Sequence, residues 1–273
     1  MKLSHITQTY GRTPFTTARV VCNQLAYAFV RSVKKTPKEG WLYSQWHWSK
    51  SPFSLQRHVL WSCPLRAWFY VEDETSIEVM LHMPTYEPVS WVAPEPGNVF
   101  IDVGAHTGWY TIQAARAIGP AGRVIALEPD ETNRRQLERN VSLNEIKNHT
   151  IIPTAVWSKS GSVQWSPGQA SVWHKIDEAH GTQTVRTVTL DDLVSQLSLP
   201  SVDWIKMDIE GAEVDAIKGA EQLLRRFRPV LFIEIHETLE QVKGLLGGLG
   251  YSIDKAEFDQ PPDRHGWILA RCL

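Results

Sequence analysis

The fold is decided by the stretch 99-VFIDVGAHTG-108, an apolar run that enters a turn containing two glycines. The apolar run predicts a buried strand, and the pattern that continues to Ile118 predicts a helix directly after the turn. Gly104 allows a close approach of the backbone, and Gly108 lets the following helix pack tightly. A strand, a glycine turn and a helix in this order are typical of the first unit of an α/β sheet.

Apolar runs alternate with helical patterns from this stretch to the end of the chain, which predicts a largely parallel sheet with crossover helices. The further strands are expected over residues 123–127, 149–156, 184–190, 202–208, 229–235, 251–256 and 267–271. Helices are expected from a cap at Asp130 to Leu143, over 212–226 and up to 247–248, with Asp191 or Asp192 opening a short one.

The chain is expected to divide near 94-PEPG-97, into an N-terminal segment (1–95) and an α/β domain (96–273). A helix over 18–33 and strands over 67–71 and 76–80 are expected in the first part. Six of the 12 tryptophans precede residue 95. They either pack together in a small appendage or form a platform for a carbohydrate or another flat apolar substrate.

Composition excludes several classes of protein. Lys and Arg number 28 against 30 Asp and Glu, so no overall positive field favours a nucleic-acid partner. The three cysteines have no Cys-x-x-Cys spacing, which fits a reducing compartment. No apolar run is long enough to span a membrane and no secretory leader is evident, so a cytoplasmic protein is expected. Homo-oligomerisation remains open.

Two carboxylates at predicted strand ends indicate the cofactor. Asp102 places a negative charge before the glycine turn, where a phosphate-binding loop would avoid one. Glu128 follows the next strand and can accept both hydroxyls of an adenosine ribose. Together they predict a nucleoside cofactor, and a cationic sulfonium tolerates Asp102 better than a pyrophosphate does. A dinucleotide oxidoreductase is the competitor, but His106 replaces the middle glycine of its motif.

Beyond the turn, the chain resembles the FkbM family of methyltransferases. The resemblance covers about residue 86 to the C-terminus and rests mainly on 205-IKMDIEGAE-213 followed by 218-KGA-220. The strings 189-TLDDL-193 and 86-YEP-88 also match. It implies the class I (Rossmann-like) methyltransferase fold, a seven-stranded, mostly parallel sheet whose last strand is antiparallel. It also implies methyl transfer from S-adenosylmethionine to a hydroxyl of a sugar or natural-product acceptor.

The resemblance also implies where S-adenosylmethionine would bind. Asp102, Gly104 and Ala105 would line its methionine side, Glu128 its ribose and the turn at Ala155-Val156 its adenine, with residues 163–184 above the site as a lid or substrate loop. The complete set of expected cofactor residues adds neighbours of these positions: His106, Thr107, Gly108, Pro129 and Asp208.

The acceptor side is expected where two neighbouring strands end in ionisable residues. These are Asp208 with Glu210, and Glu234 with His236. Methyl transfer to an alcohol needs a base, and His236 is the natural one by pKa. Lys206 is a further catalytic candidate, although it can equally serve to neutralise a buried acid, and Glu210 can instead open the next helix.

Other chemistry remains open at the same strand ends. Asp208, Glu234 and His236 could present two oxygens and an imidazole to a divalent ion such as Mg²⁺, which would acidify the acceptor hydroxyl. N-methylation of a small-molecule amine is one alternative to O-methylation. A catalytically silent nucleoside-binding protein of the same fold is another.

Overall fold

The computed structural model describes residues 9–33, 55–73, 76–77, 79–80, 87–166, 175–176, 181–260 and 264–272. The chain forms two compact units, residues 1–86 and 87–273. Residues 87–92, which the sequence places in the first part, belong to the second unit. They pack there because the Gln113 side chain donates hydrogen bonds to the carbonyls of Val89 and Val92, at 3.2 and 3.0 Å.

The first unit contains a three-stranded antiparallel sheet and one helix. The strands are β1 (Thr9–Gly11), β2 (His58–Ser62) and β3 (Ala67–Val71), and the helix is α1 (Pro14–Val33). Tyr10, Trp61 and Trp68 are cross-strand neighbours, and the two tryptophan rings lie 4.9 Å apart. These aromatic residues therefore pack on one another, whereas Trp41, Trp46 and Trp48 lie outside the described residues.

The strand expected over residues 76–80 is wrong. Residues 76, 77, 79 and 80 are helical. Asp73 and Ser76 account for the difference, because the Asp73 carboxylate accepts from the Ser76 N–H at 2.7 Å and the Ser76 hydroxyl accepts from the Asp73 N–H at 3.1 Å. This reciprocal capping favours a helix start over an extended chain.

The second unit is built on a seven-stranded sheet in the order β13-β14-β12-β11-β4-β5-β6. Its strands are β4 (Val99–Val103), β5 (Arg123–Leu127), β6 (His149–Ile152), β11 (Trp204–Met207), β12 (Val230–His236), β13 (Tyr251–Gln260) and β14 (His265–Cys272). Only β14, the last strand, runs antiparallel to its neighbours in this sheet. The predicted class I methyltransferase fold is confirmed.

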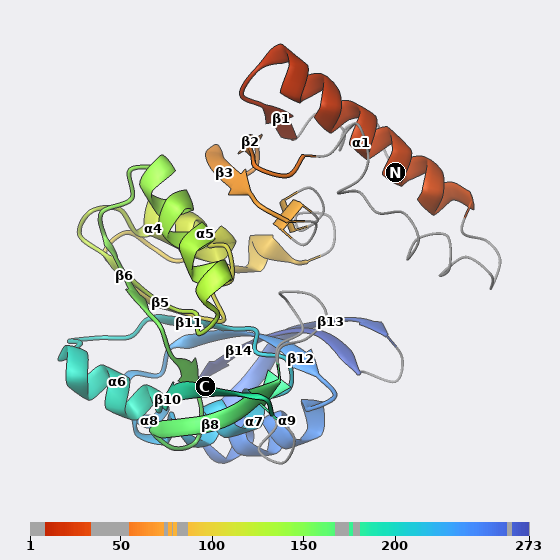
Figure 1. Cartoon of the computed structure of the whole chain (residues 1–273). Coiled ribbons are helices and arrows are strands. Elements are labelled where there is room, and N and C mark those ends of the chain that lie inside the picture. Colours follow the sequence, from red (N-terminus) through yellow and green to blue (C-terminus); the bar gives the residue numbers. More distant parts are fainter. Residues whose placement is uncertain are drawn as a thin grey trace. The chain divides into compact units, whose positions relative to one another are not determined.

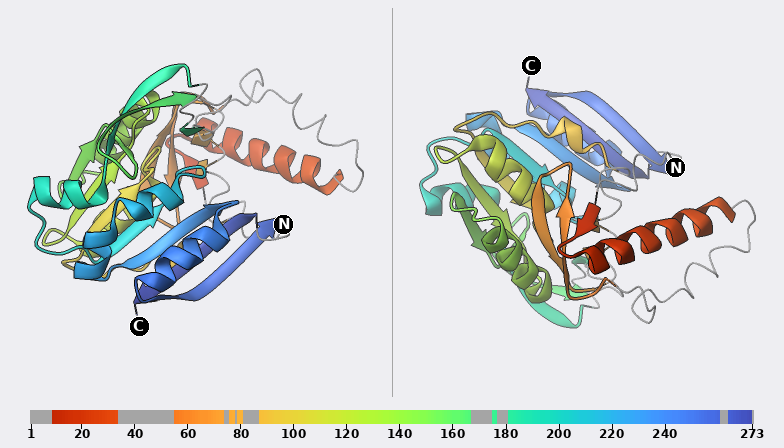
Figure 2. Two further views of the ribbon diagram at one scale, coloured as in Figure 1. Left: turned by 90° about the horizontal axis from the view of Figure 1, so that it is seen from below. Right: turned by 90° about the horizontal axis from the view of Figure 1, so that it is seen from above.

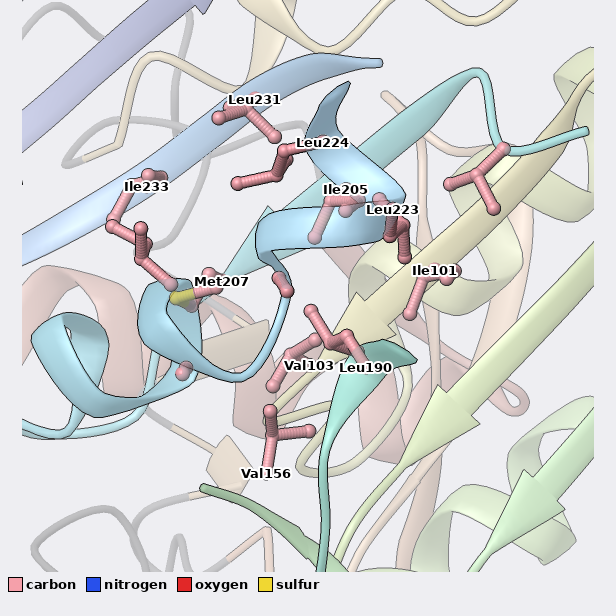
Figure 3. Close-up of a cluster of buried hydrophobic side chains, with 14 of the residues drawn as sticks. Ile101, Val103, Val156, Leu190, Ile205, Met207, Leu223, Leu224, Leu231 and Ile233 are labelled. Atoms are coloured by element: carbon pink, nitrogen blue, oxygen red, sulfur yellow. The ribbon is translucent and has the colours of Figure 1, made fainter. Parts of the chain in front are cut away.

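Helices cover both faces of this sheet (Figures 1 and 2). One face carries α4 (Trp109–Ile118) and α5 (Glu131–Leu143). The other carries α6 (Leu190–Leu197), α7 (Glu213–Lys218), α8 (Glu221–Phe227) and α9 (Leu239–Gly248). Because side chains alternate along a strand, residues such as Ile101, Ile205 and Ile233 enter the core beneath α6–α9 (Figure 3). The residues next to them in the strands, such as Asp102 and Phe232, point to the opposite face and contact α4.

Two helix predictions need correction. The single helix expected over 212–226 is two helices, α7 and α8, separated at Gly219, where a Cβ would lie 2.4 Å from the Trp157 carbonyl oxygen. The short helix α6 is capped by Thr189, whose hydroxyl accepts from the Asp192 N–H at 2.9 Å. Asp191 instead accepts from two backbone N–H groups at the start of α8. The cap at Asp130 is confirmed.

The strand expected over 149–156 divides into β6 and the short β7 (Ala155–Val156). β7 belongs to a second sheet, ordered β7-β10-β8-β9, with β8 (Gly161–Ser166), β9 (Lys175–Ile176) and β10 (Gln183–Val188). Much of the expected loop over 163–184 is therefore β-structure, and residues 167–174 and 177–180 lie outside the described part. None of the described helices has the length and apolarity to cross a membrane.

Candidate active site

The glycine turn lies at the carboxyl end of β4, against the end of β11. Gly104 has a φ of +74°, and a Cβ there would lie 1.9 Å from the Asp208 carbonyl oxygen. Gly108 has a φ of +93°, and a Cβ there would lie 2.5 Å from Leu137 of α5. Both positions therefore need glycine, for its left-handed backbone and for the lack of a side chain.

Glu128 lies at the end of β5 and holds the turn. Its carboxylate accepts from the His106 N–H at 2.7 Å and from the Asp130 N–H at 2.9 Å. Burial raises its pKa to about 7, against the lowering effect of these two hydrogen bonds. Each carboxylate oxygen has a second lone pair, so Glu128 can accept from the hydroxyls of a ribose while it orders the turn.

The other expected cofactor residues differ in how accessible their side chains are to a ligand. Ala105 and Thr107 are buried, and Pro129 is half-buried with its carbonyl accepting from Arg134. Val156 is 2% exposed and packs in the core beneath α6–α9 (Figure 3). A ligand could therefore contact only the backbone of Val156. Ala155 is half-buried, so its side chain is open to contact as well.

Lys206 joins the turn to the end of β11. Its ammonium donates to the Gly104 carbonyl at 2.8 Å and lies 3.6 Å from a carboxylate oxygen of both Asp102 and Asp208. Burial opposes its charge, yet Asp208 and Asp102 raise the pKa of Lys206 above its ordinary value. Burial raises the pKa of Asp102, which is fully buried and accepts from the Thr111 hydroxyl at 2.6 Å.

The ends of β11, β12 and β14 bring together five side chains, which we call the acid–imidazole cluster: Asp208, Glu210, Glu234, His236 and His265. His236 is central in it. Its Nε2 lies 3.6 Å from Glu210 and 3.8 Å from Glu234, and its Nδ1 lies 3.1 Å from Glu213. Glu210 faces His236 rather than capping α7, whose cap position is Ala212.

The charges of this cluster determine its protonation. Burial lowers the pKa of His236, but the Glu213 hydrogen bond and the surrounding carboxylates outweigh burial and raise it to about 9. Burial raises the pKa of Glu234 well above its usual range, helped by the charge of Asp208. Asp208 is half-buried, and although burial acts to raise its pKa, Lys206 and His236 hold it below the ordinary value. Asp208 is therefore ionised at neutral pH.

The sequence did not single out three contributors. His265 of β14 pairs in register with His236, and its Nε2 lies 2.7 Å from Glu234. Glu213 orients His236 and is itself held by the Thr238 hydroxyl at 2.9 Å. Glu87 accepts from the Tyr110 hydroxyl at 2.7 Å, and burial raises its pKa to about 7. Glu213 and Glu87 stand within the strings that carry the family resemblance, but only the fold reveals their contacts.

The residues expected to bind a metal do not form one set. Among the described residues, one group with ligand atoms within 4.8 Å of one another is Glu234, His236 and His265, and the second is Asp208, Glu210 and His236. Asp208 and Glu234 thus belong to different groups that share His236.

S-adenosylmethionine fits the donor half by its chemistry. Glu128 offers a buried acceptor for ribose hydroxyls, the first turn of α4 follows the glycine turn, and the acid–imidazole cluster supplies negative charge for a cationic sulfonium. The residues that would hold it are Gly104, Ala105, His106 and Glu128.

Comparison with known proteins gives a matching family model, described as Methyltransferase FkbM domain, over residues 102–260. The chain is 29% identical over 150 residues to the hexuronic acid methyltransferase AglP of Haloferax volcanii, covering 54% of this chain and 59% of that protein. It is 25% identical over 153 residues to the 2-O-methyltransferase NoeI of Sinorhizobium fredii, covering 49% and 62%.

Among solved structures, methyltransferase FkbM from Methylobacillus flagellatus KT matches with a TM-score of 0.49 and 21% identity, covering 67% of this chain and 45% of that one. The chain thus spans about half to two thirds of the length of these relatives.

Proposed function

Because the chain belongs to the FkbM methyltransferase family, we propose that it transfers a methyl group from S-adenosylmethionine to a hydroxyl of a sugar or natural-product acceptor. One observation carries the proposal: Lys206 contacts both the Gly104 carbonyl of the donor turn and Asp208 of the acid–imidazole cluster. A nucleoside site and a proton-accepting cluster would therefore lie next to each other, with Lys206 between them. The names of the relatives, a hexuronic acid methyltransferase and a 2-O-methyltransferase, favour a sugar hydroxyl.

S-adenosylmethionine supplies, when bound, a methyl group on a positively charged sulfur. Glu128 holds the ribose and the backbone of Gly104 to His106 lines the methionine side. The acid–imidazole cluster would hold the acceptor hydroxyl next to the methyl group, which would lower the entropic cost of the encounter. The acceptor oxygen gains the methyl group and loses its proton to the cluster. The products are a methyl ether and S-adenosylhomocysteine.

Asp208 is the candidate proton acceptor at neutral pH, and His236, whose pKa is raised to about 9, becomes a second one as the pH rises through that value. The hydrogen bond between Glu213 and Nδ1 of His236 directs Nε2 into the cluster, as an orienting carboxylate does for a general base. Asp208 is ionised and adjoins His236. Lys206 compensates the charge of Asp208 and fixes the turn, so we assign it a positioning role.

The decisive experiment is transfer of an isotope-labelled methyl group from S-adenosylmethionine to hexuronic acids and methyl glycosides. Labelled methyl ethers support the proposal. Label that appears only on amines presented in parallel indicates N-methylation. Binding of S-adenosylhomocysteine without any transfer indicates the silent nucleoside-binding alternative, and no binding at all contradicts the whole proposal.

Replacement of His236 by glutamine should lower kcat between about 100-fold and 10 000-fold, the range expected for loss of acid–base catalysis. The affinity for S-adenosylhomocysteine, measured by calorimetry, should stay within about threefold, because His236 lies outside the donor turn. The matched control is His149→Gln at the opposite end of the sheet, at the start of β6. A kcat that is unchanged in His236→Gln removes this residue from the mechanism.

Cofactor affinity should depend on pH through Glu128. Its pKa is raised to about 7, so the carboxylate is present above that pH and is protonated below it. A carboxyl group that must accept from both backbone amides and ribose hydroxyls binds best when ionised. We expect S-adenosylhomocysteine to bind about tenfold more weakly at pH 6 than at pH 8. Calorimetry across this range should show the change in the wild type and a nearly flat profile in Glu128→Gln.

A further inference from the structure

Two imidazoles lie side by side where β12 and β14 pair. His236 and His265 are register partners, and their ring centroids lie 5.2 Å apart. The Nε2 atoms of both rings approach the same oxygen, Oε1 of Glu234, at 3.8 and 2.7 Å. All three side chains are mostly buried but retain 10–16% exposure, so a small solute can reach them.

The far nitrogen of each ring is held by a separate carboxylate. Nδ1 of His236 lies 3.1 Å from Glu213, and Nδ1 of His265 lies 2.7 Å from Asp259. Histidines that bind metals almost always donate their other N–H in this way, which fixes the tautomer and makes the free nitrogen a better ligand. Here the same support occurs twice, and both supported rings present Nε2 to one carboxylate oxygen.

The charges around the pair favour a cation. Four carboxylates lie within 4 Å of the two imidazoles: Glu210, Glu213, Glu234 and Asp259. Mutual repulsion of partly buried carboxylates is costly unless positive charge compensates it. A divalent ion among these groups would supply positive charge while both imidazoles stay neutral, the form in which they bind metals.

We propose that Glu234 Oε1, His236 Nε2 and His265 Nε2 bind one divalent transition-metal ion. Ligand bonds of about 2.0–2.2 Å would place the ligand atoms roughly 3–3.6 Å apart. The distances to Glu234 Oε1 in the structure, 2.7 and 3.8 Å, lie on either side of that range. Small shifts of the side chains would therefore bring both nitrogens to the distance from Glu234 Oε1 that metal ligation requires. Two imidazoles with one carboxylate suit Zn²⁺, Mn²⁺ or Co²⁺ better than Mg²⁺, which prefers oxygen.

The role of the ion rests on the proposed function. Three protein ligands leave a coordination position open, and an acceptor hydroxyl there would be polarised and would release its proton more readily. Asp208 has an oxygen within 4.8 Å of a ligand nitrogen of His236, so it is placed to take that proton. His236 would then serve as a ligand and Asp208 as the base.

The test is metal binding by the tag-free full chain after chelator treatment. Calorimetry with Zn²⁺ should show one equivalent, and Co²⁺ should give a visible absorption band that reports nitrogen ligation. His265→Gln and His236→Gln should each weaken Zn²⁺ binding by at least about 100-fold. His149→Gln should bind as the wild type does. Glu234→Gln provides a third variant that keeps the side-chain volume.

Affinity for S-adenosylhomocysteine is measured on every sample, which shows that each variant is folded and tests the proposed function separately. The metal proposal is overturned if the wild type binds Zn²⁺ more weakly than about 1 mM, or if both histidine variants bind it as the wild type does. In either case intact S-adenosylhomocysteine binding would leave the proposed function standing.

Discussion

Glu128→Ala is expected to weaken the binding of S-adenosylhomocysteine by at least about 100-fold, equivalent to roughly 2.7 kcal/mol. The substitution removes the proposed acceptor of two ribose hydroxyls. It also leaves the N–H groups of His106 and Asp130 without the carboxylate that they contact at 2.7 and 2.9 Å. Each lost hydrogen bond to a charged group costs about 1.5–3 kcal/mol, so the donor turn loses its order together with its ligand.

Calorimetry measures this loss directly, with thermal unfolding of the free protein to show how much of it is structural. The matched control is Glu131→Ala, because Glu131 is an exposed acid three positions along the chain that pairs only locally with Arg135. Its loss should leave affinity within about twofold. If Glu128→Ala retained wild-type affinity, the ribose would have to bind elsewhere.

Gly104→Ala is expected to be the most destabilising glycine-to-alanine substitution in the second unit. The added Cβ would lie 1.9 Å from the Asp208 carbonyl oxygen, which is backbone and cannot move aside. The φ of +74° adds a left-handed strain of about 1–2 kcal/mol. Together they should cost more than about 4 kcal/mol, enough to leave much of the protein unfolded or without a donor site.

Gly97→Ala separates the two causes. Gly97 has a φ of +87°, yet no atom lies within 4 Å of a Cβ placed there, so this variant carries the strain without the collision. Urea unfolding monitored by circular dichroism should show a loss of about 1–2 kcal/mol for Gly97→Ala and a much larger one for Gly104→Ala. Similar losses at both positions would mean that the β4 and β11 turns can separate.

The donor half could be predicted from the sequence because its determinants are local. The run from Val99 to Gly108 combines an apolar strand with the two glycines that its turn needs. Glu128 followed from a crossover helix that returns the chain beside β4, and parallel pairing of β4 with β5 places it there. The capping residue Asp130 is equally local, because its side chain bonds the N–H three residues later.

The acceptor half could be predicted only in part. Asp208 and His236 end neighbouring parallel strands, whose carboxyl ends meet by topology. His265 comes from the antiparallel β14 and faces His236 through the register of β14 with β12. The chain reaches β14 through β13, whose pairing with β14 is irregular between Ile253 and Lys255 and again between Phe258 and Gln260. No local pattern specifies such irregularities. Sequence reasoning therefore cannot show which residue of β14 faces His236.

The same contrast explains the two wrong assignments near helices. Asp191 stands beside a helix start and has the composition of a cap, but its carboxylate accepts from N–H groups of α8, about thirty residues away. The residues from Ser76 to Met80 have a β-like composition, yet the Asp73 side chain bonds the Ser76 backbone and starts a helical turn. In each case one polar side chain overrides the pattern of its neighbours.

The position of Lys206 has a consequence for any attempt to redirect the enzyme to new acceptors. Its ammonium is shared between the Gly104 carbonyl and Asp208, so a library that varies the end of β11 would perturb donor affinity in nearly every clone. Among the described residues, no hydrogen bond or ion pair given above joins the ends of β13 and β14 to the glycine turn. Selection for a new acceptor should therefore enrich changes around Glu257, on the exposed edge of the sheet, and leave Lys206 and the pair His265–Asp259 untouched.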